Sequence, residues 1–426
     1  MTARRLALAL ALAVTALVPA TASAGDELRG EQWNLDAINA DAAHAVNTGS
    51  GALVAVIDSG VQSSHPDLAG NVIDGHDFIQ GDATPNDENG HGTNVAGIIA
   101  AKRNNGIGIA GAAPDAKVLA IRVLDAANRG NTSQEAAGID AAVAAGAQVI
   151  NLSLSAGPNV VTQLLPDDEL VQAIERAARA GVVVVAAAGN DGVPLCAQPV
   201  LATKILCVGA VNRARARTAY SNYAVRVDMV APGGETRAGE GILSAQLGGG
   251  YSGMAGTSQA TPHVAAAAAL LVSLGLRGDA VIDRLLNTAT NLGDPAQLGR
   301  GLLNMSAAVA GLAPATEPSS DPGAGATFSA SVPKQVRLSK VRQRGLSVRC
   351  TSPSAGTCRV RVTRAGREIA RGSRRVPAGV ATAVTARLTA AGKRSLARAR
   401  GRRFTAKVAV TGPAAGAVSL KTTLTR

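Results

Sequence analysis

The chain has 426 residues, and 46% of them are hydrophobic. This length and composition allow one large core with a smaller second domain, and they exclude a disordered protein. The formal net charge of +12 is unevenly distributed, because 23 of the 42 Lys and Arg residues but only one acid, Glu368, follow residue 330. An acidic first part is therefore joined to a strongly basic last part.

Residues 1–24 have the pattern of a secretory signal peptide. Two arginines precede an apolar run at 6–18, and the small residues from Ala22 to Ala24 follow it. The run is too short to span a membrane, and no later run of about 20 apolar residues occurs. We therefore expect a secreted protein, extracellular or associated with the cell wall, without a membrane span.

Residues 25–312 alternate short apolar runs with longer helical patterns. The runs predict strands and the longer patterns predict helices, with the strands at 52–57, 117–124, 148–154, 181–188 and 205–211 and the helices at 91–103, 132–146 and 167–181. Strands without polar alternation are buried on both faces, and their alternation with helices predicts an α/β fold with a mainly parallel sheet between helices. Functional residues in such sheets gather at the carboxyl ends of the strands.

The composition changes twice after residue 312. Residues 313–330 are rich in Pro, Ser, Gly and Ala, which predicts an extended linker. In residues 331–426, segments such as RGLSVRCT and FTAKVAVT alternate apolar with basic or polar residues, a pattern typical of half-exposed antiparallel strands. We expect a small all-β, sandwich-like domain with a short helix at 388–400.

The charge of the basic domain favours acidic partners. Outside a cell, anionic cell-wall or surface polymers fit it by simple electrostatics. Nucleic acid is not expected, because Phe404 is the only aromatic residue after residue 331 and stacking platforms are therefore missing. The alternative, that the charge only keeps the domain solvated, stays open. We expect a monomer.

Four cysteines form two close pairs along the sequence, Cys196 with Cys207 and Cys350 with Cys358. An exported chain favours local disulfides, and neither pair has the additional His or Cys spacing of a zinc site. Buried free thiols are the alternative.

Four polar residues stand where predicted strands end or helices begin: Asp58 in VAVIDSGV, His91 in NGHGTNVAG, Asn190 in VVVVAAAGND and Ser258 in GTSQATPHVA. Each has an ordinary explanation as well. A serine at a helix start is a typical cap, Asp and Asn are typical of turns, and most lone histidines lie on the surface. Together they supply what catalysis by a serine nucleophile requires, namely a base, an orienting carboxylate and a donor to the oxyanion.

These motifs also resemble those of a known family. VIDSGV, HGTNVAG, AAAGN and GTSQATPHVA stand in the order of the subtilisin-like serine proteases, the subtilases, and the chain resembles them over roughly residues 31–310. The resemblance implies a subtilisin-like three-layer domain and an endopeptidase that hydrolyses proteins through an acyl-enzyme. It implies that Ser258 is the nucleophile, His91 the base, Asp58 the residue that orients the base, and Asn190 an oxyanion donor.

The resemblance implies a substrate cleft as well. An extended protein or peptide substrate would pair with the end of one strand and lie against the end of another, at Ser153, Leu154 and Ser155 and at Ala187, Ala188 and Gly189.

A structural Ca²⁺ ion is the one cofactor that the resemblance implies. Its ligands would be Asp67, Asn105 and the carbonyl oxygens of Ile107 and Ile109, because calcium takes oxygen ligands. A plain polar loop is the alternative. No cofactor is expected for the chemistry itself.

A rival hypothesis is a non-catalytic surface-binding or adhesion protein on a subtilase scaffold. Such a protein would lack a triad member, and this chain has all three. Many subtilases also have a propeptide of several tens of residues, whereas only residues 25 to about 30 separate the expected signal peptide from the catalytic domain here. We therefore expect folding without a covalent pro-domain.

Overall fold

The computed structural model describes residues 25–154, 168–198, 202, 204–313, 328–352, 356–376, 382–398, 403–412 and 417–425. The predicted signal peptide, most of the predicted linker and Ser155 lie outside these residues. Within them, buried apolar side chains form separate cores before and after residue 313, and no core cluster there combines side chains from both parts. Each part therefore has a core of its own.

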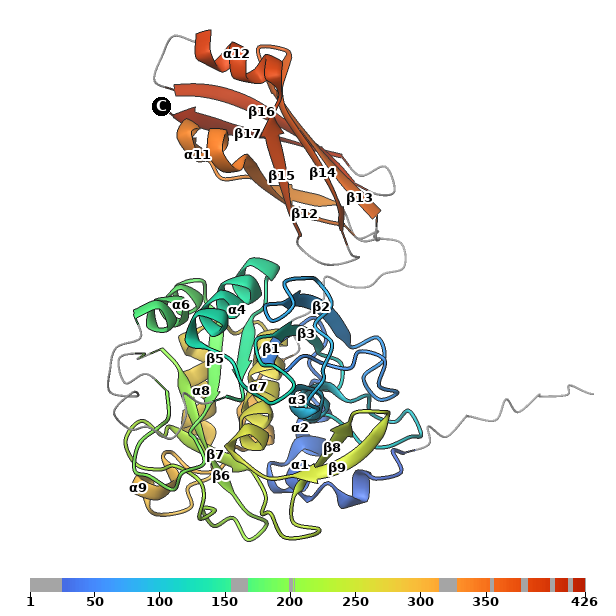
Figure 1. The fold of residues 1–426 in the computed structure, drawn as a ribbon, viewed down its shortest axis with the longest axis vertical. Helices are drawn as coiled ribbons and strands as arrows, with labels where there is room; N and C mark the ends of the chain where they lie inside the picture. The colour runs from blue at the N-terminus through green and yellow to red at the C-terminus, as the bar shows by residue number, and fades with distance from the viewer. Residues whose placement is uncertain are drawn as a thin grey trace, which may run out of the picture.

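A parallel seven-stranded sheet forms the centre of the first part (Figure 1), in the order β2-β3-β1-β4-β5-β6-β7. Its strands are β1 (Leu53–Asp58), β2 (Val72–Asp77), β3 (Lys117–Arg122), β4 (Val149–Leu152), β5 (Val183–Ala187), β6 (Leu206–Val211) and β7 (Met229–Pro232). Alternate residues of β1 enter different cores, since Val54 and Val56 face one and Ala55 and Ile57 the other. The sheet is therefore buried on both faces, as its apolar runs indicated.

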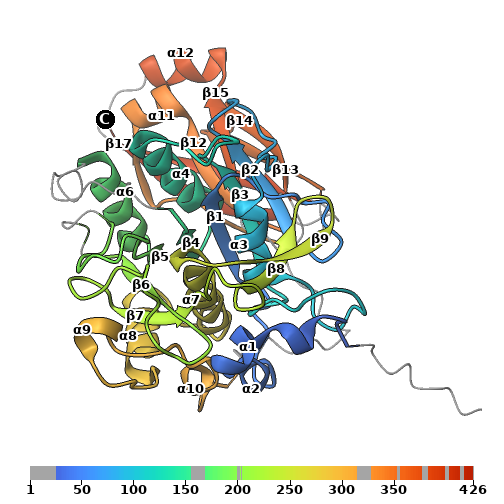
Figure 2. The ribbon, with the colours of Figure 1, turned by 60° about the horizontal axis from the view of Figure 1, so that its bottom comes forward.

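Helices cover both faces of this sheet, which confirms the predicted three-layer α/β fold (Figure 2). One layer consists of α4 (Thr132–Ala145) and α6 (Asp168–Arg179). The other consists of α2 (Ala40–His44), α3 (His91–Ala100), α7 (Thr257–Ser273), α8 (Asp279–Thr288) and α10 (Met305–Val309). The other elements among the described residues of this part are η1 (Arg29–Glu31), α1 (Trp33–Ala37), α9 (Pro295–Leu298) and the hairpin of β8 (Ile242–Gln246) and β9 (Gly250–Met254).

Helix α7 is buried along almost its whole length. Its five consecutive alanines, 265–269, are all buried and allow close packing against α3 and strands β4 to β7. Alanine is also the best helix former, so the same run favours the helix and its burial. Ser258, in the first turn, is one of the few residues of α7 that stay partly exposed.

The second part is all-β as expected, but its strands form one curved eight-stranded sheet, a half-barrel, in place of two packed sheets. The order is β10-β12-β15-β14-β13-β16-β17-β11. Its strands are β10 (Ser329–Ser331), β11 (Gln335–Arg337), β12 (Leu346–Thr351), β13 (Gly356–Arg364), β14 (Arg367–Val376), β15 (Thr382–Leu388), β16 (Arg403–Thr411) and β17 (Ala417–Thr425).

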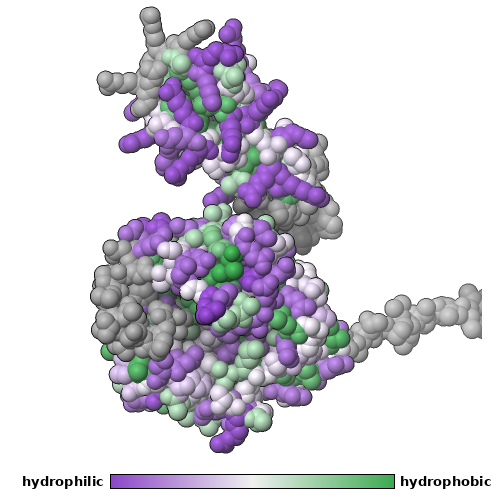
Figure 3. All heavy atoms as spheres, in the orientation of Figure 1, coloured by the Kyte–Doolittle hydropathy of each residue, from purple (hydrophilic) through white to green (hydrophobic). Residues whose placement is uncertain are grey.

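Two helices complete the core of this half-barrel. Helix α11 (Leu338–Arg344) contributes Leu338 and Val341, and α12 (Ala390–Arg398) contributes Leu396, to the cluster formed by the strands. These side chains cover the apolar face of the sheet, so a second sheet is not needed. The other face is exposed, and Figure 3 shows many hydrophilic side chains projecting from this part of the molecule.

Both predicted disulfides are present. Cys196 is bonded to Cys207 with Sγ atoms 2.06 Å apart, and Cys350 is bonded to Cys358, which joins β12 to β13. No cysteine in the part of the chain that the structure describes is free. None of the helices described is both long and apolar enough to cross a membrane.

Candidate active site

Asp58 is the last residue of β1, and its carboxylate is completely buried. Its Oδ1 accepts a hydrogen bond from the backbone N–H of Ser59 (2.7 Å) and lies 2.8 Å from Nδ1 of His91. The turn after β1 thus holds the carboxylate in one orientation, toward the imidazole. The structure therefore brings the expected orienting carboxylate, Asp58, into direct contact with the expected base, His91.

His91 reaches Asp58 because α3 begins very close to the turn after β1. A Cβ atom on Gly92 would lie only 2.1 Å from the carbonyl oxygen of Gly60, so a larger residue would push the helix start away. Asp87 fixes the same region, accepting hydrogen bonds from the hydroxyls of Ser59 (2.9 Å) and Thr93 (2.6 Å). The glycine after His91 is therefore required by packing.

Burial is the largest single influence on the pKa of His91, and by itself it would lower that pKa. The charge of Asp58, its hydrogen bond to the ring, and the charge of Asp87 act in the opposite direction, and together they raise the pKa of His91 above its ordinary value. The ring is therefore a stronger base than an ordinary histidine. Such a ring is suited to accept a proton from a hydroxyl group.

Ser258 is the second residue of α7, and its side chain does not cap that helix. The N-cap position belongs to Gly256, and the residues described there form no side-chain cap hydrogen bond. The Ser258 hydroxyl donates to the carbonyl oxygen of Ser153 (3.1 Å), and the Ser153 hydroxyl donates to the carbonyl oxygen of Ser258 (2.8 Å). The helix-cap explanation is therefore wrong, and the hydroxyl lies beside the carboxyl end of β4.

The helices that begin at His91 and at Thr257 pack against each other. Nε2 of Gln259, the residue after Ser258, donates to Oδ1 of Asn94, one turn along α3 from His91 (3.3 Å). The candidate base and nucleophile thus belong to one packed pair of helices. In this resting arrangement the Ser258 hydroxyl donates to Ser153 and not to His91.

Asn190 follows β5, and its amide has a defined orientation. Its Oδ1 accepts hydrogen bonds from the backbone N–H (2.9 Å) and the hydroxyl (3.0 Å) of Thr257. The amide nitrogen is consequently left for an acceptor outside the first turn of α7. Gly189 is needed just before it, since its φ is +102° and a Cβ there would lie 2.5 Å from Nδ2 of Asn222.

A cavity of about 420 Å³ opens beside Ser258. Ser153, Leu154 and Ala187, three of the residues predicted to contact substrate, line it together with Asn190. Ala188 is fully buried and instead packs against the Cys196–Cys207 disulfide. The structure therefore brings the ends of β4 and β5 together around the nucleophile candidate.

The other side of this cavity was not predicted from the sequence. It is formed by the segment after β3 and the first turn of α4, namely Val123, Leu124, Asn128, Arg129, Gly130, Asn131, Thr132 and Glu135. Because this segment follows the carboxyl end of a central strand, the rule applied to β1, β4 and β5 would have found it. Asn131 caps α4 by accepting a hydrogen bond from the backbone N–H of Gln134 (2.8 Å). This cap fixes the start of α4, whose first turn lines the cavity.

The family model of the subtilase family matches residues 49–301, a span that includes Asp58, His91, Asn190 and Ser258. The chain belongs to the subtilase family. It is 41% identical over 261 residues to thermitase from Thermoactinomyces vulgaris, covering 61% of this chain and 89% of thermitase. It is 42% identical over 279 residues to subtilisin Savinase from Lederbergia lenta, covering 65% of this chain and 97% of that protein.

Solved structures agree with this assignment. A protease from Pseudoalteromonas arctica PAMC 21717 superposes on the subtilase with a TM-score of 0.62 at 32% identity, covering 68% of this chain and 99% of the other. A cold-adapted subtilisin-like serine proteinase superposes with a TM-score of 0.53, also at 32% identity, covering 61% and 90%. Together with the family match, these relatives identify the subtilase as a serine-type endopeptidase, a hydrolase of peptide bonds.

The loop expected to bind calcium in this subtilase lies against Asp67, which is completely buried. The Asp67 oxygens accept hydrogen bonds from Nδ2 of Asn105 (2.7 Å) and from the backbone N–H of Ile109 (2.9 Å). The donor set fits the ion chemically, because carboxylate, amide and carbonyl oxygens are its usual ligands. In the arrangement observed, however, nitrogen donors face the carboxylate, and the described residues contain no metal-binding group of three or more His, Cys, Asp or Glu side chains.

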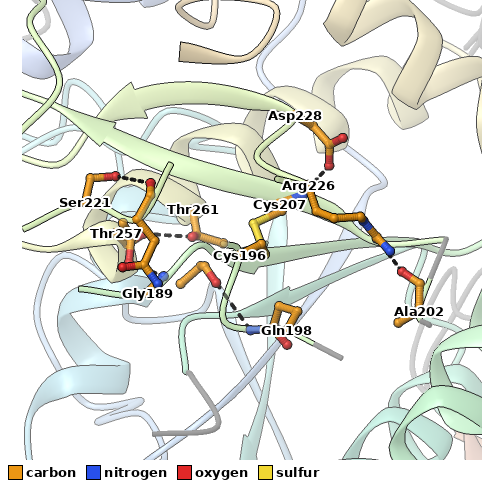
Figure 4. The surroundings of a disulfide bond; sticks show 12 residues. Gly189, Cys196, Gln198, Ala202, Cys207, Ser221, Arg226, Asp228, Thr257 and Thr261 are labelled. Atoms are coloured by element: carbon orange, nitrogen blue, oxygen red, sulfur yellow. Dashed lines mark hydrogen bonds between the residues drawn. A yellow bond between two sulfur atoms is a disulfide. The ribbon is translucent and has the colours of Figure 1, made fainter. Parts of the chain in front are cut away.

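Figure 4 shows the Cys196–Cys207 disulfide, whose Cys196 lies two residues before Gln198 in the chain. The disulfide fixes the segment that bears Gln198, whose amide donates to the carbonyl oxygens of Leu154 (2.9 Å) and Ala187 (3.3 Å). Gln198 thus connects the ends of β4 and β5, the two strand ends that line the cavity. The sequence indicated the disulfide but not this connection.

Proposed function

We propose that this subtilase cleaves proteins through Ser258, His91 and Asp58 by way of an acyl-enzyme. The observation that supports the proposal most is the 2.8 Å contact between Nδ1 of His91 and the buried Oδ1 of Asp58. When Nδ1 donates to the carboxylate, Nε2 is the ring nitrogen that accepts a proton. His91 begins α3 and Ser258 lies in the first turn of α7, and these two helices pack against each other.

In the proposed reaction, Oγ of Ser258 attacks the carbonyl carbon of the peptide bond and its proton passes to Nε2 of His91. The tetrahedral intermediate breaks its C–N bond, and the leaving amine takes the proton from His91. Water then attacks the ester on Ser258 while His91 accepts a proton from the water and returns it to Oγ. Asp58 stabilises the imidazolium at each step through charge and orientation.

The proposed oxyanion donors are Nδ2 of Asn190 and the backbone N–H of Ser258. The orientation of the Asn190 amide supports this assignment, because Thr257 engages its oxygen and leaves its nitrogen for the substrate. The N-terminus of α7 adds a positive partial charge at the same point. An extended substrate would lie along Ser153, Leu154 and Ser155, with Ala187 on its other side.

Fluorophosphonate labelling and peptide hydrolysis test the proposal directly. The unmodified protein should label and cleave at about pH 8, where a histidine base is largely neutral. A Ser258→Ala variant with an unchanged thermal midpoint should do neither. Absence of labelling and cleavage in the unmodified protein would leave the non-catalytic binding protein as the better explanation. Equal labelling of both proteins would show that the nucleophile is a residue other than Ser258.

We also propose that the protease is secreted and that its domain of residues 331–426 holds it on anionic polymers at a surface, with residues 25–312 as the peptidase domain. The two disulfides support an oxidising compartment. The 23 basic residues after residue 330, against a single acid, support attraction to polyanions. Protein or peptide substrates would then be cleaved close to that surface.

We propose in addition that the loop of Asn105, Ile107 and Ile109 binds structural Ca²⁺ together with Asp67. The ion would bind oxygen atoms of these four residues and add stability without taking part in the chemistry. Millimolar Ca²⁺ should then raise the thermal midpoint of the protein over that in chelator, and an Asp67→Asn variant should lose most of the rise. An equal midpoint with and without Ca²⁺ would show that the loop is closed by protein hydrogen bonds alone.

A further inference from the structure

Three arginines stand directly opposite one another on neighbouring strands of the half-barrel. Arg361 of β13 pairs with Arg371 of β14, and Arg371 in turn pairs with Arg387 of β15. All three are exposed, so they project from the same outer face of the sheet. We call Arg361, Arg371 and Arg387 the arginine ladder.

The arginine ladder is an unfavourable arrangement for the isolated domain. Neighbouring strands lie about 4.8 Å apart, and like charges directly opposite each other are destabilising. The only acid after residue 330 is Glu368, whose carboxylate lies 2.9 Å from Nε of Arg361 and 3.9 Å from Nε of Arg371. One carboxylate is therefore shared by two of the three guanidinium groups. A ligand with several acidic groups would relieve the remaining repulsion.

The surface around the arginine ladder is shaped for a chain molecule. A cavity of about 570 Å³ lies over Arg361 and Arg371 and includes Arg359, two residues from Arg361 on the same face. The row of the ladder continues through small exposed residues, since Arg361 pairs with Ala409 of β16 and Ala409 with Ser419 of β17. The row thus crosses five strands, with charge on three and no bulky side chain on the other two.

The chemistry of this face favours an acidic polysaccharide. The planar guanidinium group binds carboxylates and phosphates through paired N–H donors, which a lysine cannot do. Bases of nucleic acids need aromatic side chains for stacking, and Phe404, the only aromatic after residue 331, is buried beneath the guanidinium of Arg364 at 4.8 Å. We propose that the arginine ladder binds an extended acidic polysaccharide across β13, β14 and β15. This inference rests on the proposed role of the basic domain as a surface anchor.

The test compares two triple variants of the full chain that each remove three positive charges. One replaces the arginine ladder (Arg361→Gln, Arg371→Gln, Arg387→Gln), and the control replaces exposed residues of α11 (Lys340→Gln, Arg342→Gln, Arg344→Gln). With polygalacturonate as probe at low salt, we expect about tenfold weaker binding for the first and no more than about twofold for the control. Hydrolysis of a short peptide should be unchanged in both.

Equal weakening in the two variants would overturn the arginine ladder as a site and leave general attraction by net charge. If the unmodified chain did not bind polygalacturonate at all, both the proposed surface attachment and the proposed binding by the arginine ladder would be refuted. Tighter binding of an oligothymidylate than of polygalacturonate would replace the polysaccharide with single-stranded nucleic acid. None of these outcomes bears on Ser258, which the labelling experiment tests separately.

A further single variant tests the site in the opposite direction. Glu368→Gln removes the one carboxylate that competes for Arg361 and Arg371. If the arginine ladder binds the polymer, this variant should bind polygalacturonate about two- to threefold more tightly, with a weaker effect at high salt. Unchanged or weaker binding would contradict the proposal, and this result decides the matter if the triple variant fails to fold.

Discussion

The raised pKa of His91 determines how activity should vary with pH. In the proposed mechanism His91 must be neutral to accept the Ser258 proton, so kcat/KM rises as pH increases through the pKa of the ring. Because Asp58 and Asp87 raise that pKa despite burial, half-maximal kcat/KM should fall above about pH 6.5, the ordinary value for histidine. A pH series with a short peptide measures this point. A midpoint below the ordinary value would show that burial dominates.

Gln259 should make the activity resistant to oxidation. It is buried beside Ser258, with Nε2 3.9 Å from the sulfur of Met254 and bonded to Asn94. A Gln259→Met variant would place an oxidisable thioether beside the nucleophile. After dilute peroxide we expect the unmodified enzyme to retain more activity than the variant. A Met254→Leu control shows how much of any loss comes from oxidation of Met254 and not of position 259. Equal losses of activity in the unmodified enzyme and in Gln259→Met would refute the idea.

Single residues differ in how far the sequence reveals them. Asp58, His91, Asn190 and Ser258 occur in short motifs whose chemistry is specific, so the amino-acid sequence alone is enough to propose them. Gln198 could not be found in this way, because its role depends on reaching two strand ends that are 11 and 44 residues away along the chain. Such residues are recognisable only once the fold has brought their partners together.

At the scale of elements, strands with continuous apolar runs were predictable and the others were not. The five predicted strands correspond to β1, β3, β4, β5 and β6, within a few residues at each end. Strand β2 was missed because it lies at the edge of the sheet and is half polar, and β7 because it has four residues and ends in Pro232. Period-two alternation likewise predicted β13 and β16, although it does not reveal whether strands form one curved sheet or two packed sheets.

The Cys196–Cys207 disulfide should contribute to both stability and substrate binding. Replacing both cysteines by alanine should lower the free energy of unfolding by about 2–4 kcal/mol, since the bond closes a short loop. It should also raise KM, because Gln198 would no longer be fixed between Leu154 and Ala187. Denaturant unfolding and steady-state kinetics measure the two effects.

The matched control makes the same chemical change in the other part of the chain. Replacing Cys350 and Cys358 by alanine should destabilise the half-barrel and leave KM for a short peptide unchanged, since these cysteines belong to a separate core. A rise in KM in both variants would point to a general loss of structure and not to the support of the cavity.

At the scale of the whole molecule, the separate cores predict that activity and surface attachment can be separated. A chain ending at residue 312 should keep its kcat/KM for a short peptide, because no core cluster of the described residues crosses that point. It should no longer be retained on a polygalacturonate resin at low salt, whereas the full chain should elute only as salt screens its charge. Equal retention of both chains would exclude the basic domain as the anchor.

The paired hydrogen bonds between Ser153 and Ser258 affect the reactivity of the enzyme when no substrate is bound. The Ser258 hydroxyl donates to a carbonyl oxygen, a group too weakly basic to remove its proton. A side-chain rotation about the Cα–Cβ bond toward His91 must therefore precede attack, and a peptide that lies along Ser153 is well placed to cause it. A bound polypeptide would then favour the reactive rotamer of Ser258, so the free enzyme should react with a fluorophosphonate more slowly than it attacks a peptide in the cleft.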